Sequence, residues 1–177
     1  AIIPQPNWQD DLRDFKKLGA PRLFFGISAG AMDSMVNHYT AARRRRSDDA
    51  YTPDGRAGAR PDMPSIVYTR ILKKLYPDTP VIIGGIEASL RRLSHYDYWK
   101  DTLQPSILID SGADMLIYGM GEKPIVELVQ QMKNQLSTKE SPLTGNELKK
   151  IAAGIPQIAY LSRASEWTPA EDDIQLY

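Results

Sequence analysis

The chain has 177 residues, 42% of them hydrophobic, and it carries 22 basic and 22 acidic side chains. A chain of this length can bury about 70% of its unfolded surface, so we expect a single domain over residues 1–177. The zero net charge provides no general attraction for nucleic acid or an anionic membrane. The sequence contains no cysteine, which excludes disulfides, a cysteine nucleophile and cysteine-ligated zinc or iron–sulfur sites within these residues.

The two ends of the chain indicate a fragment of a longer protein. The sequence begins with Ala1, inside an apolar run, and it stops shortly after an acidic run at 171–173. No apolar stretch approaches the roughly 20 residues of a membrane span, and the N-terminus lacks the pattern of a signal peptide. These features predict a cytoplasmic protein.

Apolar runs alternate with amphipathic segments from the N-terminus onward. Residues 1–3 read as a strand, and a helix is expected next, with Asn7 as its cap and Gly19 as its stop. Residues 22–27 read as a second, buried strand that ends in the small residues 28–30. Strands and helices that alternate in this way are typical of a parallel sheet.

A long polar segment, residues 37–64, interrupts this alternation. It carries four consecutive arginines and several turn-forming residues, and it is too long for an ordinary connection. Such segments in compact domains are either functional or disordered. Tyr39 and Tyr51 favour an ordered segment with a binding role.

The alternation then resumes and continues to the end of the chain. Ser65 is expected to cap a helix that precedes a buried strand at 80–83. The later segments, in order, are a helix at 88–93, a strand at 114–118, helices at 122–135 and 146–151, and a strand at 155–161. Because Pro156 cannot donate to a ladder, the last strand is expected at an edge of the sheet.

Small residues follow three of the predicted strands. Because parallel strands end at the same edge of a sheet, these turns are expected to form one crevice that could hold an anion or a flat cofactor. The candidate crevice residues are Ser28, Gly30, Gly84, Gly85, Glu87, Gly119, Gly121 and Glu122. The alternative is that the glycines only permit tight turns and that the two glutamates complement helix dipoles.

Known nucleotide-binding motifs do not match these turns. Pro124 stands where the third glycine of the dinucleotide fingerprint is required, which argues against a nicotinamide site. No glycine–lysine–hydroxyl run follows a strand, so there is no Walker loop either.

Basic side chains form a second set of candidates, for contact with a substrate or a partner. They are Arg43, Arg44, Arg45, Arg46, Arg91, His38 and His95. Guanidinium groups suit phosphate binding, although nearby aspartates also allow the arginines to lie in a solvated, ion-paired loop. The two histidines could act as bases, but they lack metal-ligand spacing, and a structural role is the simpler reading.

Several long stretches resemble one known family. Residues 26–51, 84–92, 95–99 and 157–161 are similar to the N-terminal region of the YgiQ-type radical SAM proteins. The resemblance covers essentially the whole chain.

The resemblance implies a Rossmann-like sheet, related to cobalamin-binding domains, with helices on both faces. It also implies that the first strand–helix unit is missing, and the resulting open sheet edge would allow self-association. In that family a catalytic barrel follows, whose cysteines hold a 4Fe-4S cluster that cleaves S-adenosylmethionine to a radical. The resemblance therefore makes this chain an accessory domain that is not catalytic alone.

Three further questions stay open at the level of the sequence. The Asp-x-His-x-x-Gly motif of cobalamin domains is absent, so corrinoid binding is an unsettled alternative. A nucleotide or nucleic-acid binding module that uses the arginine run is a second reading of function. A purely structural domain that only docks the barrel is a third.

Overall fold

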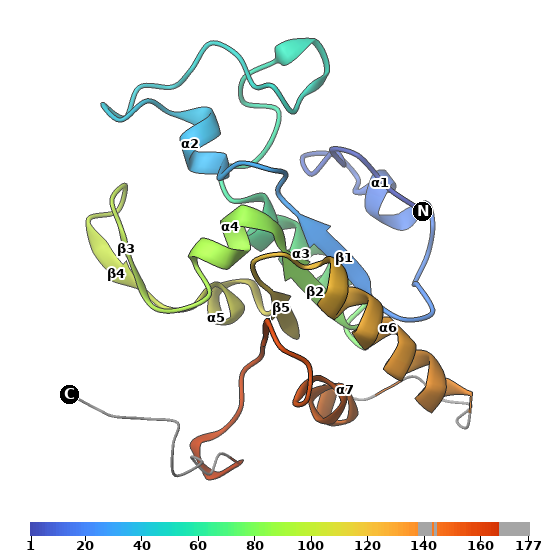
Figure 1. Cartoon of the computed structure of the whole chain (residues 1–177). Helices are drawn as coiled ribbons and strands as arrows, with labels where there is room; N and C mark the ends of the chain where they lie inside the picture. The colour runs from blue at the N-terminus through green and yellow to red at the C-terminus, as the bar shows by residue number, and fades with distance from the viewer. Residues whose placement is uncertain (138–142, 144, 167–177) are drawn as a thin grey trace, which may run out of the picture.

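The computed structural model describes residues 1–137, 143 and 145–166, which fold around a four-stranded sheet (Figure 1). The strand order is β1-β2-β5-β6. Strands β1, β2 and β5 are parallel neighbours, whereas β6 pairs with β5 in the antiparallel direction. The predicted α/β class and the edge position of the last strand are confirmed. The strands are β1 Phe25–Ser28, β2 Val81–Gly84, β5 Met115–Ile117 and β6 Ile158–Ala159.

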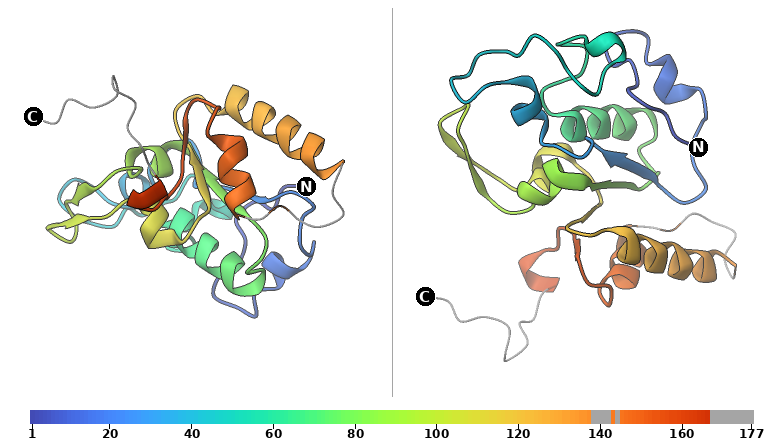
Figure 2. Two further views of the ribbon diagram at one scale, coloured as in Figure 1. Left: turned by 90° about the horizontal axis from the view of Figure 1, so that it is seen from below. Right: turned by 45° about the horizontal axis from the view of Figure 1, so that its top comes forward.

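Helices cover both faces of this sheet, as predicted. Val81 and Ile83 of β2 point into a core shared with α1, α3 and α5, while Ile82 between them points into a core shared with α6 and α7. Figure 2 shows α6 and α7 on the side of the sheet opposite α3. The five helices are α1 Arg13–Lys16, α3 Pro64–Leu75, α5 Ile107–Ser111, α6 Glu122–Leu136 and α7 Gly145–Ala152.

The N-terminal segment differs from the prediction. Residues 1–3 form no strand, and the helix expected from Asn7 is reduced to the single turn of α1, which begins at Arg13. Pro4 and Pro6 have no backbone N–H to offer a sheet. Asn7 closes a local turn instead, since its Oδ1 accepts a hydrogen bond of 3.1 Å from the backbone two residues later.

The start of α3 is also displaced from the prediction. The helix begins at Pro64, and Ser65 is the second helical residue rather than the cap. Proline suits this first position because its missing N–H would have no partner there. The Ser65 hydroxyl is buried and has no hydrogen-bond partner among the described residues.

Most of the remaining elements lie at the carboxyl end of the parallel strands. Helix α4 Gly85–Leu90 follows β2 directly, and α2 Ser34–His38 opens the long polar segment, which also contains the short 3-10 helix η1 Pro53–Gly55. The hairpin of β3 His95–Asp97 and β4 Thr102–Gln104 was not predicted. Figure 1 shows the hairpin and α2 on the same side of α4. A second 3-10 turn, η2 Ala164–Glu166, follows β6.

Candidate functional site

The carboxyl ends of the first two parallel strands meet closely, as the sequence predicted. Gly85 has a φ of 83°, and a Cβ there would lie 2.7 Å from the Ser28 hydroxyl oxygen and 3.4 Å from the Gly30 carbonyl oxygen. A Cβ on Gly84 would approach the Ile117 carbonyl oxygen of β5 to 3.3 Å. The close approach of neighbouring strands accounts for glycine at these positions without a ligand.

The third strand end has its own set of contacts. Gly119 has a φ of 69° and donates its N–H to the Ser89 hydroxyl at 3.3 Å, and a Cβ on it would lie 2.8 Å from Gln157 Nε2. Gly121 precedes α6, and Glu122 is exposed in the first turn of that helix. The eight candidate crevice residues therefore lie at one edge, but packing between the turns explains most of the glycines.

Glu87 is placed differently from the other candidates. Its side chain is fully buried, and Oε1 accepts a 2.9 Å hydrogen bond from the backbone N–H of Ser65. This carboxylate therefore caps the N-terminus of α3, where a negative charge is favoured. Its second oxygen, Oε2, is buried and has no hydrogen-bond partner in the described part of the chain.

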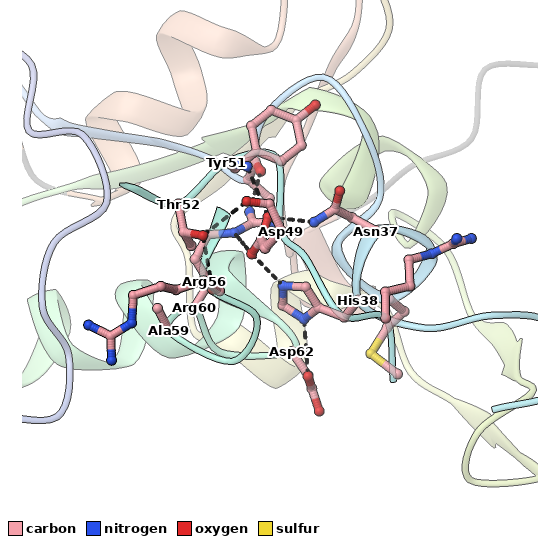
Figure 3. Close-up of polar contacts among 12 residues, drawn as sticks. Asn37, His38, Asp49, Tyr51, Thr52, Arg56, Ala59, Arg60 and Asp62 are labelled. Atoms are coloured by element: carbon pink, nitrogen blue, oxygen red, sulfur yellow. Dashed lines mark hydrogen bonds and ion pairs between the residues drawn. The ribbon is translucent and has the colours of Figure 1, made fainter. Parts of the chain in front are cut away.

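A buried polar network organises the long polar segment around Asp49 (Figure 3). The Asp49 side chain is 1% exposed, and its oxygens accept hydrogen bonds from Asn37 Nδ2 at 2.6 Å and from Arg60 Nε at 2.9 Å. Arg60 also donates to the carbonyl oxygen of Ala29, just after β1, at 3.1 Å. The network therefore fastens the segment to the sheet.

The charge state of Asp49 follows from these contacts. Burial raises the pKa of the carboxyl, but the hydrogen bonds from Arg60, the Tyr51 backbone and Asn37 outweigh this effect and lower the pKa to about 2. Asp49 is therefore ionised and paired with the buried guanidinium of Arg60.

His38 lies between two carboxylates in the same network. Its Nε2 is 3.2 Å from Asp49 Oδ2, and its Nδ1 is 3.1 Å from Asp62 Oδ1. A carboxylate only accepts hydrogen bonds, so both contacts are satisfied when both ring nitrogens carry protons. Tyr39 donates to the other oxygen of Asp62 at 2.9 Å, and burial together with this bond raises the pKa of Tyr39. Both ring nitrogens of His38 are thus engaged within the protein.

Three arginines of the run contact the protein itself. Arg43 donates to the carbonyl oxygen of Tyr98 at 2.5 Å and lies over the Tyr98 ring, 4.5 Å from its centroid. Arg46 donates to the Val36 carbonyl oxygen at 3.3 Å. The Arg45 guanidinium packs so closely on Gly58 that a Cβ there would lie 2.6 Å from it. Arg44 is exposed.

A pocket of about 290 Å³ lies beside this network. Two of the predicted contact residues, Arg91 and His95, line it. Arg91 forms an ion pair with Asp33, the N-cap of α2. Burial lowers the pKa of Arg91, but Asp33 and other nearby carboxylates raise the pKa by a larger amount. The pKa of Arg91 therefore lies above its usual value. The other lining residues are Met35, Asp62, Met63, Ile66, Asp97, Trp99, Lys100, Gln104, Ile107 and Asp110.

Most of these lining residues were not predicted from the sequence. The cluster at 95–99 was visible as a concentration of aromatic and polar side chains, and it supplies His95, Asp97 and Trp99. Nothing in the sequence links that cluster to Asp62 or Asp110, which come from distant segments. The crevice residues and the pocket are thus two different surfaces near the same end of the sheet.

The residues of this chain do not fit the cofactors implied by the resemblance. The sequence has no cysteine to hold an iron–sulfur cluster. Within residues 1–137, 143 and 145–166, no three histidine, cysteine, aspartate or glutamate side chains are grouped so that they could hold a metal ion. The packed strand-end turns show no feature that favours the binding of a corrinoid, so we assign a corrinoid no role in this chain. None of the helices described here has the length and apolar character that crossing a membrane requires.

Comparison with known proteins gives a consistent result. The family described as "Radical SAM N-terminal" matches residues 1–172. The chain is 75% identical over 177 residues to a UPF0313 protein of Bacteroides thetaiotaomicron, and 61% identical over 178 residues to one of Porphyromonas gingivalis. It covers 28% and 26% of the length of these relatives. The UPF0313 protein YgiQ of Escherichia coli is 59% identical over 132 residues, which are 75% of this chain and 18% of YgiQ. No solved structure matches the chain.

Proposed function

Because this chain belongs to the radical SAM N-terminal family, we propose that it is the accessory domain of an enzyme that depends on a 4Fe-4S cluster and S-adenosylmethionine. The observation that carries the proposal is the family match over residues 1–172, in a chain that spans about a quarter of the length of its relatives. The remaining length in those relatives provides room for a catalytic barrel. Because this chain contains no cysteine, in our proposal the cluster lies in that remaining part.

We base the proposed role of the accessory domain on the surface at the carboxyl end of its sheet. The polar segment 37–64 and the β3–β4 hairpin are fastened to each other and to the sheet there. In our proposal this ordered surface faces the barrel and helps to enclose the substrate. The pocket and the candidate crevice residues other than the buried Glu87 would then line one side of the enclosure.

The test uses the full-length Bacteroides thetaiotaomicron relative, which is 75% identical to this chain over the shared region. After anaerobic reconstitution we expect iron–sulfur absorbance and reductive cleavage of S-adenosylmethionine. The matched controls are a variant with its cysteines replaced by alanine and the isolated 177-residue chain, neither of which should bind a cluster. A reconstituted full-length protein without cluster absorbance would refute the enzyme assignment.

The nucleic-acid reading receives less support from the contacts. Arg43 and Arg46 bond to backbone carbonyls of this chain, and Arg45 packs against Gly58. The side chain of Arg44 is exposed and forms no hydrogen bond or ring contact with the residues that the structure describes. This reading, the purely structural domain and self-association through a sheet edge remain predictions.

A further inference from the structure

The pocket combines an apolar base with hydrogen-bond acceptors that are not used by the protein. Met63 and Ile66 at the start of α3 and Ile107 of α5 supply apolar surface. The Trp99 ring adds an aromatic wall, held by contacts with Tyr39 at 5.5 Å and Tyr98 at 5.3 Å between ring centroids. An apolar pocket with a few fixed polar groups is the usual form of a small-molecule site.

The protonation pattern of His95 is set by its neighbour. Its Nδ1 lies 3.1 Å from the carbonyl oxygen of Leu93, which can only accept, so Nδ1 carries the proton. In the neutral ring, Nε2 then has a lone pair and acts as an acceptor. No hydrogen bond joins Nε2 to another of the described residues, so this acceptor is available to a ligand in the pocket that His95 lines.

Two carboxylates provide further acceptors. Oδ1 of Asp97 accepts the backbone N–H groups of Trp99 at 2.8 Å and of Lys100 at 3.1 Å, which fixes the carboxylate and leaves Oδ2 available. The backbone carbonyl of Asp110 accepts a hydrogen bond from Arg70 at 2.6 Å, whereas its carboxylate forms no hydrogen bond or ion pair with the residues that the structure describes. Both residues are part of the pocket lining.

The other charged groups of the lining already have partners. Arg91 is paired with Asp33, and Asp62 is bonded to His38 and Tyr39. Lys100 is exposed and donates to Gln104 Oε1 at 3.2 Å. Asp33 neutralises Arg91, whereas Gln104 is uncharged and leaves the charge of Lys100 in place. The lining therefore sets the three carboxylates of Asp62, Asp97 and Asp110 against Lys100, and this negative balance favours a cation.

The size of the ligand is constrained by how the acceptors are spread. His95, Asp97 and Asp110 do not form a group that could hold a metal ion, within the part of the chain that is described. A polyatomic cation can reach acceptors that a single ion cannot, and its apolar part can lie against Trp99, whose ring attracts cations. We propose that this pocket binds a small organic cation, such as an amine with an aromatic or aliphatic body.

Benzylamine is a suitable probe, because benzyl alcohol and benzoate are neutral and anionic molecules of nearly the same shape. Titration calorimetry with the 177-residue chain should show that benzylamine binds. The affinities of benzyl alcohol and benzoate should be at least about tenfold lower, because neither can form the charge-assisted hydrogen bond of the ammonium group. Asp97→Asn and Asp110→Asn should each weaken benzylamine binding about tenfold. Asp78→Asn, a change at an exposed position outside this pocket, should leave the affinity unchanged.

The design separates loss of binding from loss of structure. Asp97→Asn retains the Oδ1 acceptor for the hairpin turn, and circular dichroism melting of each variant checks the fold. Equal affinity for benzylamine and benzoate, no binding of benzylamine, or unchanged affinity in both folded variants would overturn the proposal. The measurement needs no cluster, so its result is independent of the enzyme assignment tested above.

Discussion

Asp49 shows how a single residue can organise a long irregular segment. It receives hydrogen bonds from Asn37, His38, Arg60 and the Tyr51 backbone, which are spread over the segment 37–64. Most of these donors are buried with it, so the loss of the carboxylate would leave polar groups unsatisfied. The network explains how a polar stretch with little regular secondary structure adopts a defined conformation.

We expect Asp49→Asn to destabilise the protein at neutral pH by about 3 kcal/mol, because it leaves the buried Arg60 without its counter-charge. The pKa of Asp49 is lowered from 3.8 to about 2 in the folded state. Its ionised form therefore stabilises the fold fully above about pH 4, and this contribution, about 1–2 kcal/mol, is lost as the pH falls toward 2.

Urea unfolding of the wild type and of Asp49→Asn, measured at several pH values, tests this expectation. The difference between their free energies of unfolding should shrink below about pH 4. Asp78→Asn, at an exposed position, serves as the control. A difference that stays constant down to pH 2 would show that Asp49 is not the titrating group.

At the level of elements, the polar segment and the β3–β4 hairpin support each other. Arg43 reaches the carbonyl oxygens of Tyr98 and Trp99, and the Tyr98 hydroxyl donates back to Ala41 at 3.2 Å. A two-stranded hairpin is marginally stable alone, so it depends on such contacts. These contacts also hold Trp99 at the wall of the pocket.

Arg43→Ala should loosen both elements while it leaves the core intact. Amide hydrogen exchange should become faster at 39–46 and at 95–104, whereas the melting temperature should fall by only a few degrees, because surface contacts contribute about 0.5 kcal/mol. Arg44→Ala removes a neighbouring exposed arginine and is the matched control. Equal exchange in the two variants would mean that Arg43 does not hold the hairpin.

At the level of the whole molecule, the sheet has an open edge at β1. Among the residues that the structure describes, this strand pairs with β2 alone, and the backbone N–H of Phe25 donates to the Pro80 carbonyl oxygen at 2.9 Å. Along a strand, the backbone N–H groups of successive residues point to opposite sides. Since the N–H of Phe25 points toward β2, the N–H of Gly26 points away from it. Such an unpaired row of groups can pair with a second chain.

We expect the 177-residue chain to self-associate through this edge at high concentration, as measured by light scattering. Gly26→Pro removes the outward N–H and should reduce the association. Gly26→Ala keeps the N–H, and its Cβ would have only an ordinary 3.7 Å contact with Phe24, so it should behave like the wild type. A wild-type chain that stays monomeric would contradict this use of the edge.

The sequence alone was sufficient for the class of the fold and for the family. The unalternated apolar runs that became β2 and β5, each followed by glycine, mark strands buried on both faces, and this pattern depends only on local composition. The resemblance at 26–51 and 84–92 is confirmed by the family match. The strand predicted at residues 1–3 was wrong, and Pro4 and Pro6 directly after it keep so short an apolar run from extending into a longer strand.

The tertiary structure decided which polar side chains share an environment. Asp49 is one of several aspartates in a polar stretch until folding buries it against Arg60, and Glu87 caps a helix that begins at Pro64 in another segment. The pocket likewise joins Asp62, Asp97 and Asp110 from separate segments. Hydrogen bonds and charges act over a few ångströms in space, and distance along the chain does not reveal which groups will come that close.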